Sequence, residues 1–255
     1  MTRLISILLV VCFMCVGVAN AEPTRYPNGV TNVEKTSLMG QATILNPAAS
    51  HMYWNDWDTY ASGDWTITTV EAGAGSATEA LTDLDDGAIL ITNAAGDNDY
   101  DLFEKVGESF ELSDGKPMWY AVKFQTSDAT QSDLLFGIIE SSVTSPVITD
   151  PGLTDGIFFN KVDASTSINF NVRKDSTSSA YAAVGTLANA TYMTLGFYYN
   201  GVDGVEYWVD GVKIGTAVIT NLPDDEEMTV VFGIQNGEAV AKTLTVDYTM
   251  GNKNR

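Results

Sequence analysis

The sequence predicts an all-β protein, built as one antiparallel sandwich of two sheets. From residue 53 onward, short runs rich in Val, Ile, Thr, Tyr, Phe and Trp recur, separated by Gly, Asn, Asp and Ser. This texture is typical of many short strands joined by turns. No long stretch keeps the 3.6-residue period of a helix, and strands do not alternate with long helices, which argues against a parallel α/β sheet. No internal repeat or linker divides this region, so we expect a single domain.

Residues 1–21 have the pattern of a secretory signal peptide. Arg3 supplies a positive charge, residues 4–18 are apolar, and Ala19-Asn20-Ala21 forms a small-x-small cleavage site. The apolar run is shorter than the roughly 20 residues that a membrane span needs. We therefore expect a protein that is secreted or exported after signal cleavage and then has no membrane contact; the alternative is a retained membrane anchor.

The composition excludes several classes of function. The chain of 255 residues has 33 acidic and 13 basic residues, for a formal net charge of −20. Such a surface repels phosphate, so nucleic acid is not expected as a partner. One histidine excludes a multi-histidine metal centre, and two cysteines exclude a disulfide-dense scaffold. Both Cys12 and Cys15 lie in the leader, so the mature chain must be stabilised by core burial.

Residues 22–50 are predicted to form an extended N-terminal arm. They lack a sustained apolar period and contain Pro23, Pro27 and Pro47 among Asn, Gly and Ser residues. The arm is either a disordered tail or a segment that docks on another subunit. The sandwich is then expected over residues 51–255.

The strand predictions rest on local patterns, of which residues 118–125 give an example. Met118, Tyr120, Val122 and Phe124 make one apolar side, and the intervening residues make a mixed side, as in a half-buried strand. The predicted strands are Tyr53–Tyr60, Trp65–Val70, Ala88–Thr92, Asp101–Lys105, Ser109–Leu112, Met118–Gln125, Asp133–Glu140, Gly156–Val162, Ser167–Arg173, Tyr192–Asn200, Val205–Val209, Lys213–Thr216, Thr229–Gln235 and Thr243–Met250.

One stretch resembles a known fold family. In residues 199–215, Asp210-Gly211 is a strong signal for a two-residue hairpin, because glycine accepts a positive φ. This strand–turn–strand segment, with Tyr192–Tyr199 before it and Tyr53–Asp58 earlier, resembles concanavalin A-like lectin and glucanase sandwiches, including laminin-G-type domains. The resemblance implies a jelly-roll sandwich over about residues 50–250.

A narrower resemblance is to a family of marine tailed-phage virion proteins. Residues 25–32 (RYPNGVTN) resemble the opening of that family, and residues 128–133 and 232–239 resemble internal blocks. The resemblance implies a structural or decoration protein on the virion surface, with other virion subunits or surface glycans as partners. The chain departs from the family in its secretory leader, because the phage-type chain is expected to begin near residue 25.

Enzymatic activity is not favoured by the distribution of carboxylates. A retaining glycosidase needs two carboxylates about 5–5.5 Å apart. The laminarinase-type members of the fold present them from one strand as Glu-x-Asp-x-Glu or Glu-x-Asp-x-x-Glu, and no such run occurs. Glu108 and Glu111 have the wrong spacing, and residues 224–227 are typical of a solvated turn. His51 has no nucleophile motif near it. Carboxylates from separate strands stay an open alternative.

Calcium is the one cofactor that the sequence suggests. Asp97, Asp99, Asp101 and Glu108 supply oxygens at positions 1, 3, 5 and 12 of an EF-hand-like count. Leu102, however, stands where that loop needs glycine for a sharp turn. The alternative is an acidic loop that binds no ion.

Three tryptophans are candidates for binding a glycan. Trp54, Trp57 and Trp208 can stack on sugar rings if they share an exposed face, although aromatic residues of a sandwich also build its core. The function predicted is a non-enzymatic virion structural or decoration protein with a lectin-like, glycan-adhesive sandwich. The alternatives are a secreted carbohydrate-binding module and a glycan-active hydrolase or lyase. A homo-oligomer is compatible with each of these functions.

Overall fold

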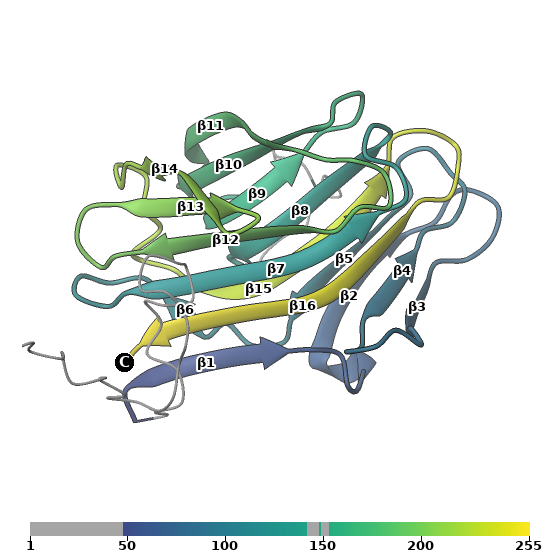
Figure 1. Cartoon of the computed structure of the whole chain (residues 1–255). Coiled ribbons are helices and arrows are strands. Elements are labelled where there is room, and N and C mark those ends of the chain that lie inside the picture. The colour runs from purple at the N-terminus through teal and green to yellow at the C-terminus, as the bar shows by residue number, and fades with distance from the viewer. Residues whose placement is uncertain (1–47, 142–147, 149–152) are drawn as a thin grey trace, which may run out of the picture. The chain divides into compact units, whose positions relative to one another are not determined.

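The computed structural model describes residues 48–141, residue 148 and residues 153–255. All of them belong to one compact unit, Val33–Arg255, and they form two antiparallel sheets of eight strands each (Figure 1). No α-helix occurs among the described residues, and no helix there is long and apolar enough to cross a membrane. The prediction of an all-β sandwich is confirmed. The predicted signal peptide and most of the predicted arm lie outside the described residues.

The first sheet contains the C-terminal strand at its centre, and the short strand β1 (Ser50–Asn55) pairs with that strand as well. Its order is β14 (Val212–Ala217), β13 (Val205–Val209), β12 (Met193–Tyr199), β7 (Met118–Thr126), β16 (Thr243–Asn254), β4 (Ile89–Thr92) and β3 (Thr78–Leu81).

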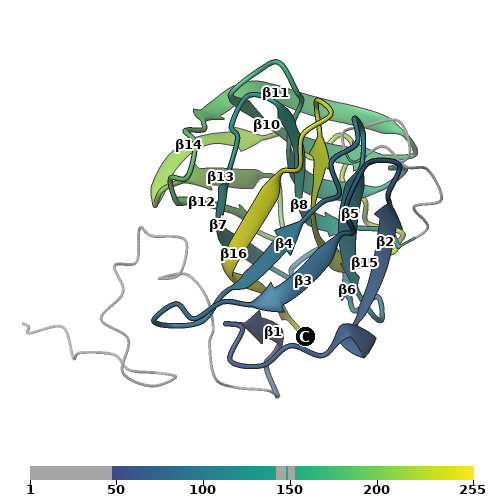
Figure 2. The ribbon, with the colours of Figure 1, turned by 90° about the vertical axis from the view of Figure 1, so that its right-hand side faces the viewer.

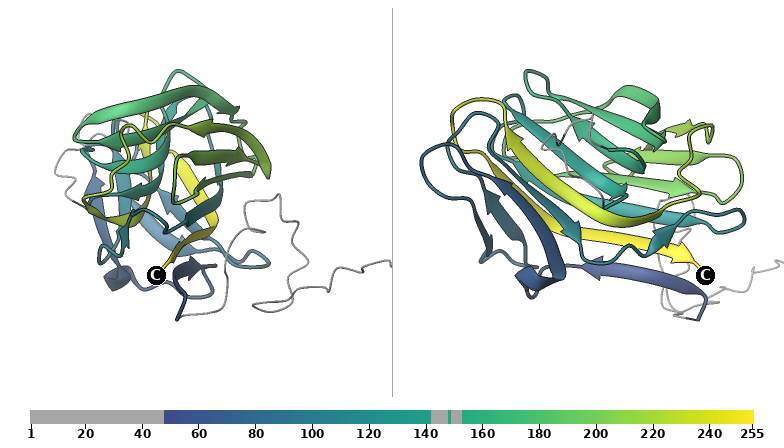
Figure 3. Two further views of the ribbon diagram at one scale, coloured as in Figure 1. Left: turned by 90° about the vertical axis from the view of Figure 1, so that its left-hand side faces the viewer. Right: turned by 180° about the vertical axis from the view of Figure 1, so that it is seen from behind.

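The second sheet lies behind the first, as the rotated views show (Figures 2 and 3). Its order is β11 (Thr177–Thr186), β10 (Ser167–Lys174), β9 (Gly156–Lys161), β8 (Ser132–Ile139), β15 (Glu227–Asn236), β5 (Tyr100–Lys105) and β2 (Trp65–Val70), and β6 (Phe110–Glu111) also pairs with β15.

The core between the sheets is built by strict alternation along the strands. The apolar side predicted for residues 118–125 faces inward, and Phe124 of β7 stacks on Phe136 of β8 with ring centroids 4.0 Å apart. Each such aromatic side chain buries a large apolar area, and burial of apolar surface is the main favourable contribution to folding. The other side of β7, which carries Trp119 and Lys123, faces away from the core.

The Asp210-Gly211 hairpin is confirmed. Both residues have positive φ, 48° and 76°, as a two-residue turn of the type I′ class requires. The Asp210 carboxylate also accepts a hydrogen bond from the backbone N–H of Thr194, at 2.8 Å. The turn therefore connects β13 to β14 and also ties them to β12.

The strand prediction fails at three places for local reasons, and in addition β16 continues to Asn254, four residues beyond the predicted end at Met250. β1 ends at Asn55, because the chain turns there and Trp57 has φ 54° while its N–H donates to Asn55 Oδ1. β3 and β11 were not predicted. β3 is a short edge strand, and β11 is an edge strand of mainly Ser, Thr and Ala residues whose side chains are mostly exposed. Such strands show little apolar alternation.

Candidate functional site

The outer side of the first sheet carries a group of aromatic side chains, which we call the aromatic face. Strand register brings its members together, since Trp54 of β1 and Ala121 of β7 both pair with Met250 of β16. On the other flank, Tyr198 of β12 pairs with Trp119 of β7. The aromatic face consists of Trp54, Trp119, Tyr198, Trp208 and Tyr248, with Ala121 and Met250 between them.

Only part of the aromatic face is open to a ligand. Trp54 is 47% exposed and lies parallel to Tyr248, with ring centroids 5.8 Å apart and planes 6° apart. Trp119 is only 2% exposed, because Tyr198 stacks on it at 4.9 Å and other members of the face surround it. The Trp54–Tyr248 pair is therefore the accessible flat apolar surface on this side.

Charged groups beside the aromatic face are mostly paired with each other. Lys123 Nζ lies 2.5 Å from Asp247 and 5.0 Å from the ring centroid of Tyr192. The hydrogen bond to Asp247 is the main reason why the pKa of Lys123 is raised. Further along the sheet, Lys213 and Glu206 form a second ion pair at 2.5 Å. These groups can exchange hydrogen bonds with the hydroxyl groups of a ligand.

Asp56 is the other carboxyl group near the stacked pair. Burial raises its pKa, and repulsion from Asp247, Asp58 and Asp86 raises it further. Asp56 and Asp247 therefore repel each other, and Lys123 attracts both. Both carboxyl groups can accept hydrogen bonds from a polar ligand.

A small polar pocket of about 140 Å³ lies at one end of β7 and β16. Gln125 and Thr245 pair across the two strands and face it together. Hydroxyl, amide and methyl groups line it, from Gln125, Thr126, Ser127, Ala190, Thr243 and Thr245. The pocket offers hydrogen bonds but no charge.

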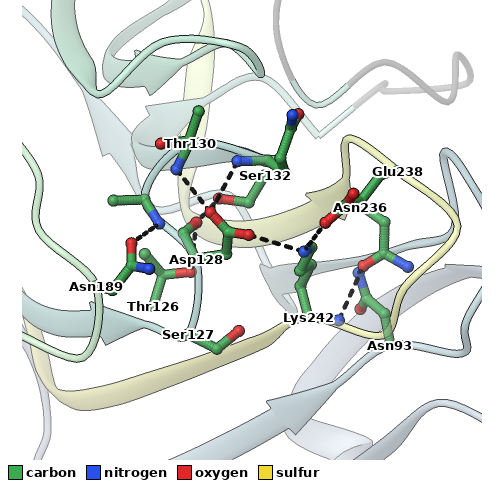
Figure 4. Close-up of polar contacts among 12 residues, drawn as sticks. Asn93, Thr126, Ser127, Asp128, Thr130, Ser132, Asn189, Asn236, Glu238 and Lys242 are labelled. Atoms are coloured by element: carbon green, nitrogen blue, oxygen red, sulfur yellow. Dashed lines mark hydrogen bonds and ion pairs between the residues drawn. The ribbon is translucent and has the colours of Figure 1, made fainter.

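A polar network next to this pocket joins four loops, which contain Asn93, Asp128, Asn189 and Lys242 (Figure 4). Lys242 is almost fully buried and its Nζ lies 2.8 Å from Asp128 and 2.5 Å from Glu238. Burial alone would raise the pKa of Asp128, but hydrogen bonds from Lys242 and from the backbone N–H groups of Gln131 and Thr130 outweigh it and lower the pKa to about 2. The network thus satisfies the charge of one buried lysine with two carboxylates that are partly exposed.

Two segments that the sequence analysis compared with phage virion proteins, residues 128–133 and 232–239, contribute to the same network, and the comparison itself stays a prediction. Residues 128–133 supply Asp128, and residues 232–239 supply Asn236 and Glu238. Asn236 Nδ2 donates to the carbonyl oxygens of Ala94 and Gly96, and Asn93 Nδ2 donates to Asn236 Oδ1 at 3.1 Å. In this structure both blocks hold loops together. The third block, residues 25–32, lies outside the described residues.

The three predicted tryptophans do not share one exposed face. Trp57 is 1% exposed and packs against Trp65 and Phe232 in the core. This corrects the prediction for Trp57, because a ring buried there is not accessible to a glycan. The left-handed backbone at Trp57 turns its ring inward, away from the side that carries Trp54. Trp208 belongs to the aromatic face but is only 6% exposed.

The predicted calcium ligands are not brought together. Asp99 accepts hydrogen bonds from the backbone N–H groups of Ala72, Gly73 and Gly96, and Asp101 accepts one from Thr69. Glu108 lies beyond the far end of β5. The reason is that residues 100–105 form an extended strand, which cannot wrap around an ion as a loop does. Within the described residues, no group of three or more possible metal ligands occurs.

Sequence reasoning missed the partners of Trp54. Tyr248 and Asp247 lie on β16, and Lys123 lies on the mixed side of β7. The mixed composition of that side was the available signal, because a side that faces only water rarely carries a tryptophan. The pairing of β1 with β16 joins residues about 200 positions apart and has no local signature.

Comparisons with known proteins identify the fold. No protein-family model and no curated protein sequence matches the chain. Among solved structures, an endo-1,3-β-glucanase from Streptomyces sioyaensis superposes with a TM-score of 0.59 at 14% identity, covering 82% of this chain and 98% of the glucanase. Peanut lectin gives 0.54 at 11% identity, covering 80% and 97%.

A third similar structure is a protein of unknown function from Shewanella oneidensis MR-1, with a TM-score of 0.54 at 14% identity, covering 81% of this chain and 87% of that one. These likenesses establish the fold as a concanavalin A-like jelly-roll sandwich. The expectation drawn from the Asp210-Gly211 region is thereby confirmed for the fold.

Proposed function

We propose that this protein is a non-catalytic glycan-binding sandwich and that a sugar ring stacks on the Trp54–Tyr248 pair. The observation that carries this proposal is the exposed, parallel arrangement of the two rings on a rigid sheet. Sugars present C–H-rich faces that pack on aromatic rings, and their hydroxyl groups need donors and acceptors around the ring. Lys123, Asp247 and Asp56 supply such groups next to the pair.

The distribution of carboxylates supports binding without hydrolysis. The outward positions of β7 are Trp119, Ala121, Lys123 and Gln125, and none of them is acidic. Of the carboxylates at this side, Asp247 and Glu206 each form an ion pair with a lysine. A retaining hydrolase needs one free carboxylate as nucleophile and a second carboxyl group as acid.

The similar structures favour a glycan as the ligand class. One is an endo-1,3-β-glucanase and another is a lectin. The chain itself carries both charges near the stacked pair, in the Lys123–Asp247 ion pair. A neutral, hydroxyl-rich glycan is therefore the class we propose, and β-1,3-linked glucan oligosaccharides are the first probe.

Calorimetric titration of the full-length protein with these oligosaccharides tests the proposal. Trp54→Ala is expected to weaken binding about tenfold, the equivalent of about 1.4 kcal/mol for one lost stacking contact. Trp54→Phe keeps a ring and should retain most of the affinity. Val70→Ala, an exposed position on the second sheet, is the matched control and should bind normally. Failure of the whole glycan panel to bind, or normal binding by Trp54→Ala, contradicts the proposal.

A hydrolase or lyase would be detected by release of reducing or unsaturated ends from polysaccharides. We expect no release from the wild-type protein. Release that is lost in Asp56→Asn or Asp247→Asn would instead establish an enzyme with carboxylates contributed by β16 and the β1–β2 connection.

The virion role predicted from the sequence is the more specific part of this proposal. It is supported by the three blocks that resemble phage virion proteins, and the glycan-binding side would then serve as an adhesive surface. Peptides of the chain should be present in purified particles of the encoding phage, after the position of the predicted signal cleavage. Their absence from such particles would leave the secreted carbohydrate-binding module as the function.

A further inference from the structure

A cationic pocket lies at the opposite end of β1 from Trp54. It has a volume of about 320 Å³ and is lined by His51, Ser109, Lys253, Asn254 and Arg255. The chain has 33 acidic and only 13 basic residues, so the convergence of Lys253, Arg255 and the single histidine is a local reversal of the overall charge.

The pocket is formed by residues whose backbone is held in place by the pairing of β1 with β16. His51 of β1 pairs directly with Lys253 of β16, so their side chains emerge on the same side of the sheet. The His51 ring packs against Phe110, at 5.2 Å between centroids. The Arg255 N–H donates to the carbonyl oxygen of Ala49 at 2.9 Å, and Arg255 Nε donates to that of Ser50 at 3.2 Å. These bonds fix the pocket walls.

The charges in the pocket repel one another. Burial lowers the pKa of His51, and the positive charges of Arg255 and Lys253 lower it further. Burial also lowers the pKa of Lys253, and Lys116 adds to this effect. Glu111 and Glu227 act on Lys253 in the opposite direction without restoring its ordinary pKa. Burial and neighbouring positive charges therefore disfavour the charged forms of His51 and Lys253, and an anion in the pocket would favour them.

An unpartnered polar atom also points to a missing ligand. Nε2 of His51 is buried and has no hydrogen-bond partner, and in the imidazolium form it is a donor. Neither His51 nor Lys253 takes part in any of the ion pairs found among the described residues. Lys242, by contrast, is a buried lysine with two carboxylate partners. Buried polar groups in proteins are normally satisfied.

We propose that this pocket binds an oxyanion, namely a sulfate, phosphate or carboxylate group. Lys253 and Arg255 supply charge-assisted hydrogen bonds, and Ser109 and the amide of Asn254 supply neutral ones. A tetrahedral or planar oxyanion presents enough acceptors to meet these donors at once. The inference is independent of the glycan site, because none of these residues belongs to the aromatic face.

The single histidine provides a direct readout in the full-length protein. The imidazole proton resonance is followed through a pH titration in sodium sulfate and in sodium chloride at equal ionic strength. Bound sulfate favours the imidazolium ion, so the His51 midpoint should move to higher pH in sulfate, and the resonance should shift saturably with sulfate at fixed pH. Identical midpoints in the two salts would overturn the proposal without the use of any variant.

Two lysine variants then locate the bound ion. Lys253→Met should weaken sulfate binding at least about tenfold, the usual loss for a charge-assisted hydrogen bond. Lys213→Met removes a lysine that is paired with Glu206 on the edge strand β14 and should bind sulfate normally. Equal losses in both variants would show a general charge effect and would overturn the site.

A third experiment distinguishes whether the oxyanion is a free ion or part of a sulfated glycan. A sulfated monosaccharide that binds more tightly than inorganic sulfate assigns the pocket to a sulfated glycan, and equal affinity assigns it to the free ion. Both results support the pocket, whereas absence of saturable binding by either probe rejects it.

Discussion

The outer sides of the two sheets differ in what covers them. The aromatic face of the first sheet leaves the Trp54–Tyr248 pair exposed, with ion pairs beside it. On the second sheet, an aliphatic and aromatic patch is covered by Ile148 and Leu153 from the β8–β9 connection. We call this patch the sealed face; it consists of Tyr100, Leu102, Leu135, Ile139, Phe158 and Val231.

This difference shows that the apolar outer side of one sheet is covered by the chain itself, while that of the other sheet is partly left exposed. A large exposed apolar patch on a soluble protein is either covered or used for binding. The chain covers the sealed face with its own connection, so burial there contributes to stability. It leaves the Trp54–Tyr248 pair open, where the same kind of burial becomes available to a ligand. The sheets are similar in topology, but one outer side contributes to stability and the other is available to bind a ligand.

The largest expected effect is a difference in the free energy of unfolding between a variant in the sealed face and a variant in the aromatic face. Phe158→Ala in the sealed face should lower the free energy of unfolding by about 3–5 kcal/mol, because it leaves a cavity under Leu153. Trp54→Ala on the aromatic face should lower it by less than about 1 kcal/mol, since its ring is half exposed. Urea unfolding followed by circular dichroism measures both. Similar losses in the two variants would erase the distinction.

A smaller loss of stability is expected when Leu153, which covers the sealed face, is truncated. Leu153→Ala should cost about 2–3 kcal/mol of unfolding free energy, near the lower end for a buried leucine, because the connection can partly collapse. Binding of the glucan probe should not change. Reduced glycan affinity in this variant would mean that the two sides are coupled through the sandwich.

The smallest effect concerns the buried carboxyl group of Glu104, which lies beside the sealed face. Glu104 pairs with Val231, is almost fully buried, and has an unpartnered Oε1. Burial, helped by Glu108, raises its pKa to about 7. Between pH 4.5 and 7 the folded state keeps a proton that the unfolded state releases, so stability should fall as the pH rises through this window.

Glu104→Gln should remove this contribution, which amounts to about 1–3 kcal/mol from a raised pKa of this size. The measurement is urea unfolding at pH 4.5, 6 and 7.5 for both proteins. The variant should show the shallower pH dependence, with Glu111→Gln, an exposed position, as the control. Parallel curves for Glu104→Gln and the wild type would show that the sealed face is open to water.

Local patterns predicted the elements well and the site only in part. Alternation in residues 118–125 assigned every inward side chain of that strand correctly, because a strand has a fixed period of two. Trp54 and Trp57 looked equivalent, yet the turn at Asn55 sends one to the surface and the other to the core.

The remaining features depend on contacts between distant parts of the chain. Asp97, Asp99 and Asp101 matched a calcium loop by spacing, but pairing with β2 and β15 keeps residues 100–105 extended. Tyr248 meets Trp54 only through the pairing of β1 with β16. Register between strands so far apart is decided by the packing of the whole sandwich, which no short window of sequence contains.

The short strand β1 also determines how the molecule would carry a mechanical load. Ser50 and Asn254 are paired at its start, so pulling the chain from residue 50 and from residue 254 would open the β1–β16 ladder one pair at a time. A pull between residue 50 and a sugar held on Trp54 would act differently. That tension would run along four peptide bonds of β1 itself, so the covalent backbone would carry it, and neither the ladder to β16 nor the rest of the sandwich would bear much of the load.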